Sequence, residues 1–95
     1  MQVLHARCAG LDVHPDSVVV TVLSTTPDGA VQKHPQSFGT FTVELLRLGD
    51  WLRSLPVTHA AMESTGPYWK PVWNLLEESF TLLLVNAQHL SRNFS

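Results

Sequence analysis

The amino-acid sequence predicts one α/β domain in which a mixed five-stranded sheet is combined with two helices. Residues 3–38 contain β-branched and alternating apolar residues separated by turn signals, as expected for strands. Residues 41–55 and 68–76 instead carry apolar residues at helical spacing, and short apolar runs follow them at 59–63 and 81–85. A chain of 95 residues, 44% hydrophobic and 15% charged, has the size and composition of one small globular domain.

The first three strands are expected to pair as an antiparallel meander. Residues 3–13 form the first strand, Pro15 and Asp16 form a turn, and the β-branched run 18–23 forms the second strand. Pro27, Asp28 and Gly29 predict the next turn, because proline presets the first turn angle and glycine readily adopts a positive φ. Residues 30–38 then pair back as the third strand.

The first helix is predicted by five apolar residues that recur at intervals of four and three and therefore share one helical stripe. They are Phe41, Leu45, Leu48, Leu52 and Leu55. We expect Thr40 or Thr42 to cap the amino end of this helix and Pro56 to end it. Residues 59–63 follow as a short, mostly apolar segment that suits a buried strand.

The second helix is predicted by four apolar residues that fall at positions i, i+3, i+4 and i+7. They are Trp69, Val72, Trp73 and Leu76. Pro71 is tolerated only in a first helical turn, so we expect the helix to begin close to Tyr68. Residues 81–85 are an apolar run of strand length, whereas residues 87–95 show no periodicity.

The order of the elements predicts the topology of the sheet. Strands joined through a single helix are usually parallel and connected by right-handed crossovers, so the first, fourth and fifth strands should form the parallel part. The meander then extends the opposite edge. The predicted strand order is 3-2-1-4-5, which is a ribonuclease-H-like arrangement.

Charge and cysteine content exclude several classes of protein. The net charge is −2 and the six Lys and Arg residues are scattered, so the chain does not resemble a self-sufficient nucleic-acid binder with a basic face. The single cysteine, Cys8, excludes an internal disulfide, fits a reducing cytosol, and is interpreted as a small buried hydrophobic residue. Neither a membrane-spanning run nor a secretory signal is recognisable, so we expect a cytoplasmic protein without a membrane partner.

Two carboxylates end neighbouring strands of the predicted sheet. Asp12 ends the first strand and Glu63 ends the fourth, so both should lie at one edge of the sheet. Ligands of open α/β sheets bind at the carboxyl ends of the strands, and hard oxygen ligands suit Mg²⁺ or Mn²⁺. An Asx-type turn at Asp12 and helix capping by Glu63 explain the same residues, and spacing alone does not separate the two interpretations.

Several motifs together resemble one protein family. They are Gly10-Leu11-Asp12-Val13-His14, Phe38-Gly39-Thr40-Phe41, Asp50-Trp51-Leu52, Ala61-Met62-Glu63-Ser64-Thr65-Gly66, Tyr68-Trp69-Lys70-Pro71-Val72-Trp73 and Leu84-Val85-Asn86-Ala87. With these motifs the chain resembles the amino-terminal domain of insertion sequence 110 family transposases, over nearly its whole length up to about Ala87.

The resemblance implies a function in DNA transposition and recombination in the bacterial cytoplasm. It implies a RuvC-like nuclease domain of the DEDD type with four acids, of which Asp12 and Glu63 are the first two, acting as catalytic residues and as ligands of Mg²⁺ or Mn²⁺. It also implies DNA as substrate, a guide RNA encoded by the mobile element, and a separate carboxyl-terminal domain that carries a nucleophilic serine for strand exchange.

The sequence departs from the family at its carboxyl end. The family's last two acids follow the fifth strand, yet no Asp or Glu occurs after Glu78. We therefore expect residues 1–87 to be an incomplete, truncated RuvC-like domain and residues 88–95 to be an irregular tail that is not native to the fold. Two carboxylates do not easily build a two-ion site, so the chain alone should be inactive. Partial exposure of Trp69, Trp73 and the Leu82–Leu84 side of the last strand predicts either a poorly soluble monomer or a self-associating one.

Other polar and aromatic residues allow two interpretations each. Thr65, Gly66 and Lys70 could contact nucleic-acid phosphates at the amino end of the second helix, although simple capping explains the first two. Trp69 and Trp73 could stack on bases, but two aromatic residues on an amphipathic stripe more often belong to the core.

His14 and His59 flank the acids in sequence and are interpreted as polar residues at strand ends, since imidazole is a poor ligand for Mg²⁺. Ser64 belongs to the Glu-Ser-Thr-Gly turn and is not expected to act as the family's nucleophile.

Two other functions compete with transposition. The chain could be a non-catalytic fragment that associates with a full-length transposase or with further copies of itself. It could instead be half of an actin-like or sugar-kinase phosphotransfer protein, because that superfamily also begins with a Gly-x-Asp strand and a meander. Pro15 and Asp16 stand where such proteins carry a small Gly-Thr turn for phosphate, which disfavours the second alternative.

Overall fold

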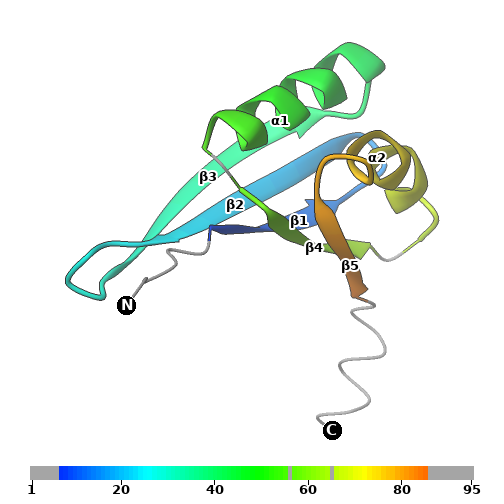
Figure 1. Ribbon diagram of the computed structural model, residues 1–95. Helices are drawn as coiled ribbons and strands as arrows, with labels where there is room; N and C mark the ends of the chain where they lie inside the picture. The colour runs from blue at the N-terminus through cyan, green and yellow to red at the C-terminus, as the bar shows by residue number, and fades with distance from the viewer. Residues whose placement is uncertain (1–6, 56, 65, 86–95) are drawn as a thin grey trace, which may run out of the picture.

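A computed structural model describes residues 7–55, 57–64 and 66–85 of the chain (Figure 1). The described part forms seven elements in the predicted order. They are β1 (Cys8–Val13), β2 (Ser17–Thr25), β3 (Val31–Gly39), α1 (Thr42–Ser54), β4 (His59–Ser64), α2 (Trp69–Leu76) and β5 (Thr81–Val85). The expected start of the first strand at residues 3–6, the role of Pro56 in ending α1, and the tail at 88–95 lie outside the described residues.

The five strands form one mixed sheet in the order β3-β2-β1-β4-β5, which confirms the predicted topology. β1 pairs antiparallel with β2 and parallel with β4, so it occupies the centre of the sheet. β3 pairs antiparallel with β2, and β5 pairs parallel with β4. Pro35 is compatible with β3 because this strand lies at an edge, where a missing N–H removes no hydrogen bond of a central ladder.

Both helices lie on the same face of the sheet, which we call the helix face. The chain steps from β1 to β4 and from β4 to β5 in one direction across the sheet, and right-handed crossovers then place both connecting helices on one side. Consistent with this, α1 and α2 contact each other and belong to one core cluster. The opposite face, which we call the open face, carries no helix within the described ranges.

The hydrophobic core fills the space between the helix face and the two helices. Alternate strand residues point into it, as the period of two along a strand requires. These are Ala9, Leu11 and Val13 from β1, Val18, Val20 and Val22 from β2, and Ala60 and Met62 from β4. The helices contribute Leu45, Leu48, Leu52, Val72 and Leu76, all of which are buried. The predicted helical stripes are therefore confirmed at these positions, whereas Leu55, Trp69 and Trp73 are only partly buried and pack against the core.

Phe41 is the main departure from the predicted first helix. It was expected on the buried stripe, but it is 80% exposed and occupies the N-cap position, where it makes no capping hydrogen bond through its side chain. The prediction that Thr40 or Thr42 caps α1 is wrong. Thr40 Oγ1 instead donates a hydrogen bond to the carbonyl of Pro15, 3.2 Å away, and Thr42 is already the first helical residue.

Cys8 is exposed, so its interpretation as a buried hydrophobic residue is wrong. It lies on the open face because it alternates with the buried residues Ala9 and Leu11. Trp69 and Trp73 are partly buried and pack against the edge of the core, with their rings at nearly right angles and centroids 5.9 Å apart. No helix in the described part of the chain has the length and hydropathy needed to cross a membrane.

Candidate metal centre at the ends of two parallel strands

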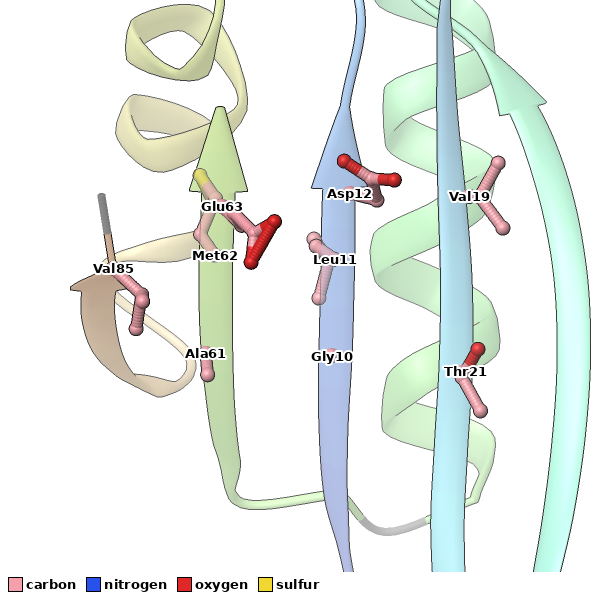
Figure 2. Close-up of a pocket in the computed structure, with 9 residues that line it drawn as sticks. All are labelled: Gly10, Leu11, Asp12, Val19, Thr21, Ala61, Met62, Glu63 and Val85. Atoms are coloured by element: carbon pink, nitrogen blue, oxygen red, sulfur yellow. The ribbon is translucent and has the colours of Figure 1, made fainter. Parts of the chain in front are cut away.

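Asp12 and Glu63 lie next to each other on the two central parallel strands. Asp12 is the penultimate residue of β1, Glu63 is the penultimate residue of β4, and the two are direct partners in the β1–β4 register. Both residues alternate with buried neighbours, and so both point to the open face. Figure 2 shows the two carboxylates beside the carboxyl ends of the two strands. The structure therefore brings together the two acids that the sequence singled out.

Both carboxylates are accessible from solvent. The side chain of Asp12 is 57% exposed, and Glu63 is partly exposed. Asp12 Oδ2 lies 3.2 Å from His14 Nε2, a distance that allows an ion pair when the imidazole is protonated. His14 therefore contacts the carboxylate of Asp12 and is not an isolated polar residue at the strand end. His59 lies at the far end of β4, where its Nδ1 is 2.8 Å from Thr58 Oγ1, and it takes no part in the acid pair.

The acids stand at one end of a hollow in the open face. This hollow has a volume of about 400 Å³, and Gly10 and Ala61 provide its floor between Thr21 and Val85 (Figure 2). A Cβ atom added to Gly10 would meet no heavy atom within 4 Å, so nothing in the described structure occupies the space above this residue. A ligand held by the acids therefore has room over the adjacent small residues.

The two carboxylates provide hard oxygen ligands, but few of them. Within residues 7–55, 57–64 and 66–85, the structure has no cluster of three or more His, Cys, Asp or Glu residues able to hold a metal. Mg²⁺ commonly binds through one or two carboxylates and completes its octahedral shell with water or substrate oxygens. The exposed pair fits such a hydrated ion, because solvent reaches both side chains.

Ser64 points away from the acids. It follows Glu63 directly, so it lies on the helix face, where it is 8% exposed. Its hydroxyl donates to the carbonyl of Gly66 at 3.0 Å and also receives the N–H of Gly66 at 3.4 Å. These bonds build the turn between β4 and α2. Ser64 therefore stabilises this turn, in agreement with its interpretation from the sequence.

Two of the three residues predicted to contact nucleic acid, Gly66 and Lys70, lie in the described part of the chain. Thr65 lies outside the described residues, and the N–H of Gly66 is engaged by Ser64. Lys70 is exposed on α2, and its Nζ lies 5.9 Å from the centroid of the Trp69 ring. Lys70 is thus available to an anion, but it lies on the helix side of the sheet.

Sequence reasoning missed the floor of the hollow. Gly10 and Ala61 are direct partners in the β1–β4 register and lie two residues before the acids on the same face. The signal that would have identified them is the period of two along each strand, which places residues i and i−2 side by side. Small residues at both positions indicate a surface to which another molecule can come close.

Comparison with known protein families gives one match. The model of a family described as a transposase, of the DEDD type from insertion sequence 110, matches residues 9–94. No curated protein sequence matches the chain.

Three solved structures illustrate the fold similarity. Thermus thermophilus RuvC, in a complex with its Holliday junction substrate, matches with 13% identity and a TM-score of 0.62, over 90% of this chain and 69% of that chain. The fowlpox virus Holliday junction resolvase matches with 8% identity and a TM-score of 0.61, over 84% and 60% respectively. An Aquifex aeolicus member of the Ppx/GppA family matches with 10% identity and a TM-score of 0.57, over 90% and 37%.

These similarities show a shared fold. Together with the strand order, they establish that the domain is RuvC-like, which is a form of the ribonuclease-H-like fold. The chain spans 37% of the Aquifex protein and 60% of the fowlpox protein, so each of those proteins contains further structure outside the matched part.

Proposed function

Because this chain belongs to the insertion sequence 110 family of transposases, we propose that it contributes a divalent metal site to DNA transposition, with Asp12 and Glu63 as the ligands. The observation that carries the proposal is the direct pairing of these two acids across the parallel strands β1 and β4, at the carboxyl end of the sheet. Mg²⁺ or Mn²⁺ suits a pair of carboxylates, and DNA is the substrate that the family implies.

The side chains of the site hold and orient the ion in this proposal. A bound divalent ion would supply Lewis-acid stabilisation of a phosphodiester and activation of water. The carboxylates of Asp12 and Glu63 each provide an oxygen ligand, and His14 fixes one oxygen of Asp12 by its 3.2 Å contact. The hollow over Gly10 and Ala61 leaves space for the sugar-phosphate backbone of a DNA strand next to the ion.

We do not expect Asp12 and Glu63 to cleave or join DNA by themselves. The resemblance implies four acids, and the sequence has no Asp or Glu after Glu78. Two ligands leave an ion largely hydrated, whereas a two-ion site needs more carboxylates. In this proposal residues 1–87 form the metal-binding domain, while strand exchange and the use of an element-encoded RNA require other parts of a transposase.

Metal binding by matched variants tests the proposal. We expect Mn²⁺ to bind weakly to the wild-type chain, with a loss of affinity in Asp12→Asn and Glu63→Gln, as measured by electron paramagnetic resonance of free Mn²⁺. Glu78→Gln is the control, because it removes an exposed carboxylate after α2. Equal affinities in the wild type and in all three variants would remove Asp12 and Glu63 as the ligands.

The geometry supports transposition over the phosphotransfer alternative. A phosphate cradle at the β1–β2 turn would need free backbone N–H groups. Pro15 has none, and the N–H of His14 already donates to the carbonyl of Ser17 at 2.8 Å. We therefore expect no ATP binding in isothermal titration calorimetry, and a measurable affinity for ATP would favour the alternative.

A further inference from the structure

The two edges of the sheet are very different in chemistry. β3, at one edge, carries Lys33 and Pro35, which are residues that discourage pairing with another strand. β5, at the other edge, has the sequence Thr-Leu-Leu-Leu-Val, with no charge and no proline. Within the described residues no strand pairs with the outer side of β5. One edge is therefore protected against strand addition, and the other is suited to it.

The unprotected edge is also apolar on both of its faces. Leu83 points to the open face and is 63% exposed, while Leu84 points to the helix face and is 40% exposed. Above Leu84 lies a groove of about 410 Å³, which is also lined by Trp69 and Trp73 of α2. Trp side chains are enriched among the residues that contribute most to binding at protein interfaces, and two of them line this groove.

The side of α2 that lines this groove carries opposite charges at its two ends. Lys70 lies in the first turn, Glu77 directly follows the helix, and Trp73 and Asn74 lie between them. These four residues recur at intervals of three and four, so they form one stripe along the helix. A stripe that is positive at one end and negative at the other is complementary to an antiparallel copy of itself.

From these three observations we propose that the occupant of this edge is a second copy of the chain, joined through antiparallel pairing of β5 with β5. Such a dimer has a two-fold axis perpendicular to the sheet, and the same surface is used by both copies. The two sheets become one continuous sheet, in which both free β5 edges are satisfied.

We propose one register for this pairing, with the two-fold axis passing through Leu83. Leu83 then lies opposite Leu83 of the second copy and Leu82 lies opposite Leu84, so that all five residues of each β5 are paired. On the helix face the two α2 helices then run antiparallel beside each other. This brings Lys70 of each copy toward Glu77 of the other, and the two-fold axis makes each contact occur twice.

The inference is independent of the metal centre. Asp12 and Glu63 lie on the inner strands β1 and β4, and the interface uses the outer side of β5 and the adjacent side of α2. Loss of metal binding in Asp12→Asn would leave the dimer unchanged, and loss of the dimer would leave the metal site unchanged. The two proposals can therefore fail separately.

Sedimentation velocity on matched edge variants tests the pairing. We expect the wild-type chain to shift from monomer to dimer with increasing concentration, and Leu83→Lys to remain monomeric. Val31→Lys is the control, because Val31 is likewise 63% exposed but lies on the β3 edge. Circular dichroism establishes that both variants are folded. A wild type that stays monomeric, or two variants that dissociate alike, would overturn the proposal.

Charge reversal tests the arrangement of the helices. We expect Lys70→Glu and Glu77→Lys each to weaken the dimer about three- to tenfold, and the double variant to recover the wild-type affinity, because it restores both attractive contacts. A double variant as weak as the single ones would contradict the antiparallel arrangement. A monomer that forms a complex only with an intact transposase would show that the partner is not a second copy.

Discussion

Gly10 lies within β1 and leaves the space over the hollow open. Its φ is negative, since Gly29 is the described glycine with a positive φ, and the space above it is open. Glycine within a strand costs roughly 0.5–1 kcal/mol relative to alanine, because it loses more conformational freedom on folding. The backbone of β1 therefore does not require glycine here, whereas the proposed ligand would gain room over the hollow.

A Gly10→Ala variant should consequently be more stable than the wild type. The added Cβ meets no atom within 4 Å, so no clash offsets the entropic gain of about 0.5–1 kcal/mol. Urea unfolding of the two proteins measures the difference. A lower free energy of unfolding in the variant would show that glycine is needed by the fold itself.

Asp28 gives a prediction for the β2–β3 turn. The hydroxyl of Thr26 donates a hydrogen bond to Asp28 Oδ1, and with the N–H of Ala30 it lowers the pKa of this carboxyl below the ordinary value of 3.8. A lowered pKa means that the carboxylate stabilises the turn at pH values above 3.8 and that this contribution is lost as the pH falls through the pKa of the folded state. Thr26→Val should raise the pKa, as measured by an NMR pH titration of the Asp28 carboxyl. An unchanged titration curve would mean that the Thr26 hydroxyl does not act on Asp28.

At the scale of elements, the amino end of α1 is poorly capped. Phe41 has the extended backbone typical of an N-cap, and its carbonyl accepts the first helical hydrogen bond from Leu45 at 3.0 Å, yet its side chain offers no oxygen to the free N–H groups. Phe41→Asp supplies that oxygen and also favours the helix dipole, so we expect a gain of about 0.5–1 kcal/mol. The midpoint of thermal unfolding should rise. A fall would indicate that the aromatic ring has a packing role.

The buried stripe of α1 can be tested against its exposed side. Leu48 is fully buried, so Leu48→Ala should cost about 2–5 kcal/mol through lost burial and the cavity that remains. Leu46, which is 48% exposed, provides the matched control, and its change to alanine should alter stability by less than about 0.5 kcal/mol. Chemical unfolding measures both, and similar losses in the two variants would contradict the assigned helix face.

Elements could be predicted from the sequence wherever periodicity decides the structure. β5 was predicted at 81–85 without error, and Leu45, Leu48 and Leu52 lie on the buried stripe as expected. Phe41 continues the same spacing, but it is the N-cap and not part of the helix. Helical spacing therefore does not predict which way its side chain points. Cys8 was misjudged from its residue type, although alternation with Ala9 would have placed it on the open face.

The two acids of the candidate site could be predicted from the positions of the strands in the sheet. Each lies at the carboxyl end of its strand, as the penultimate residue, and the strand order makes those strands neighbours. The contact between His14 and Asp12 could not be predicted, because it depends on side-chain rotamers at a turn. The hollow over Gly10 was missed because a residue with no side chain carries no chemical signal of its own.

For the molecule as a whole, stability should decrease from the centre of the sheet to its edges. β1 is paired on both sides and packed against the core, whereas β3 is exposed along most of its length and β5 is paired on one side within the described structure. Amide protons of β1 should therefore exchange most slowly with D₂O, those of β3 should exchange faster, and those of β5 should exchange faster in the monomer than in the proposed dimer. NMR-detected exchange measures this order. Equal protection of β1 and β3 would contradict it.

The pairing of Asp12 with Glu63 also determines which length changes the domain can tolerate. Side chains alternate along a strand, so deleting one residue from β4 would either turn Glu63 toward the core or expel Ala60 and Met62 from it. Deleting two residues would keep every remaining side chain on its own face. The parity of an insertion or deletion, more than its size, should therefore decide whether a natural variant keeps its acid pair. Changes of either parity should be accepted in the β2–β3 turn, which lies outside both acid-bearing strands.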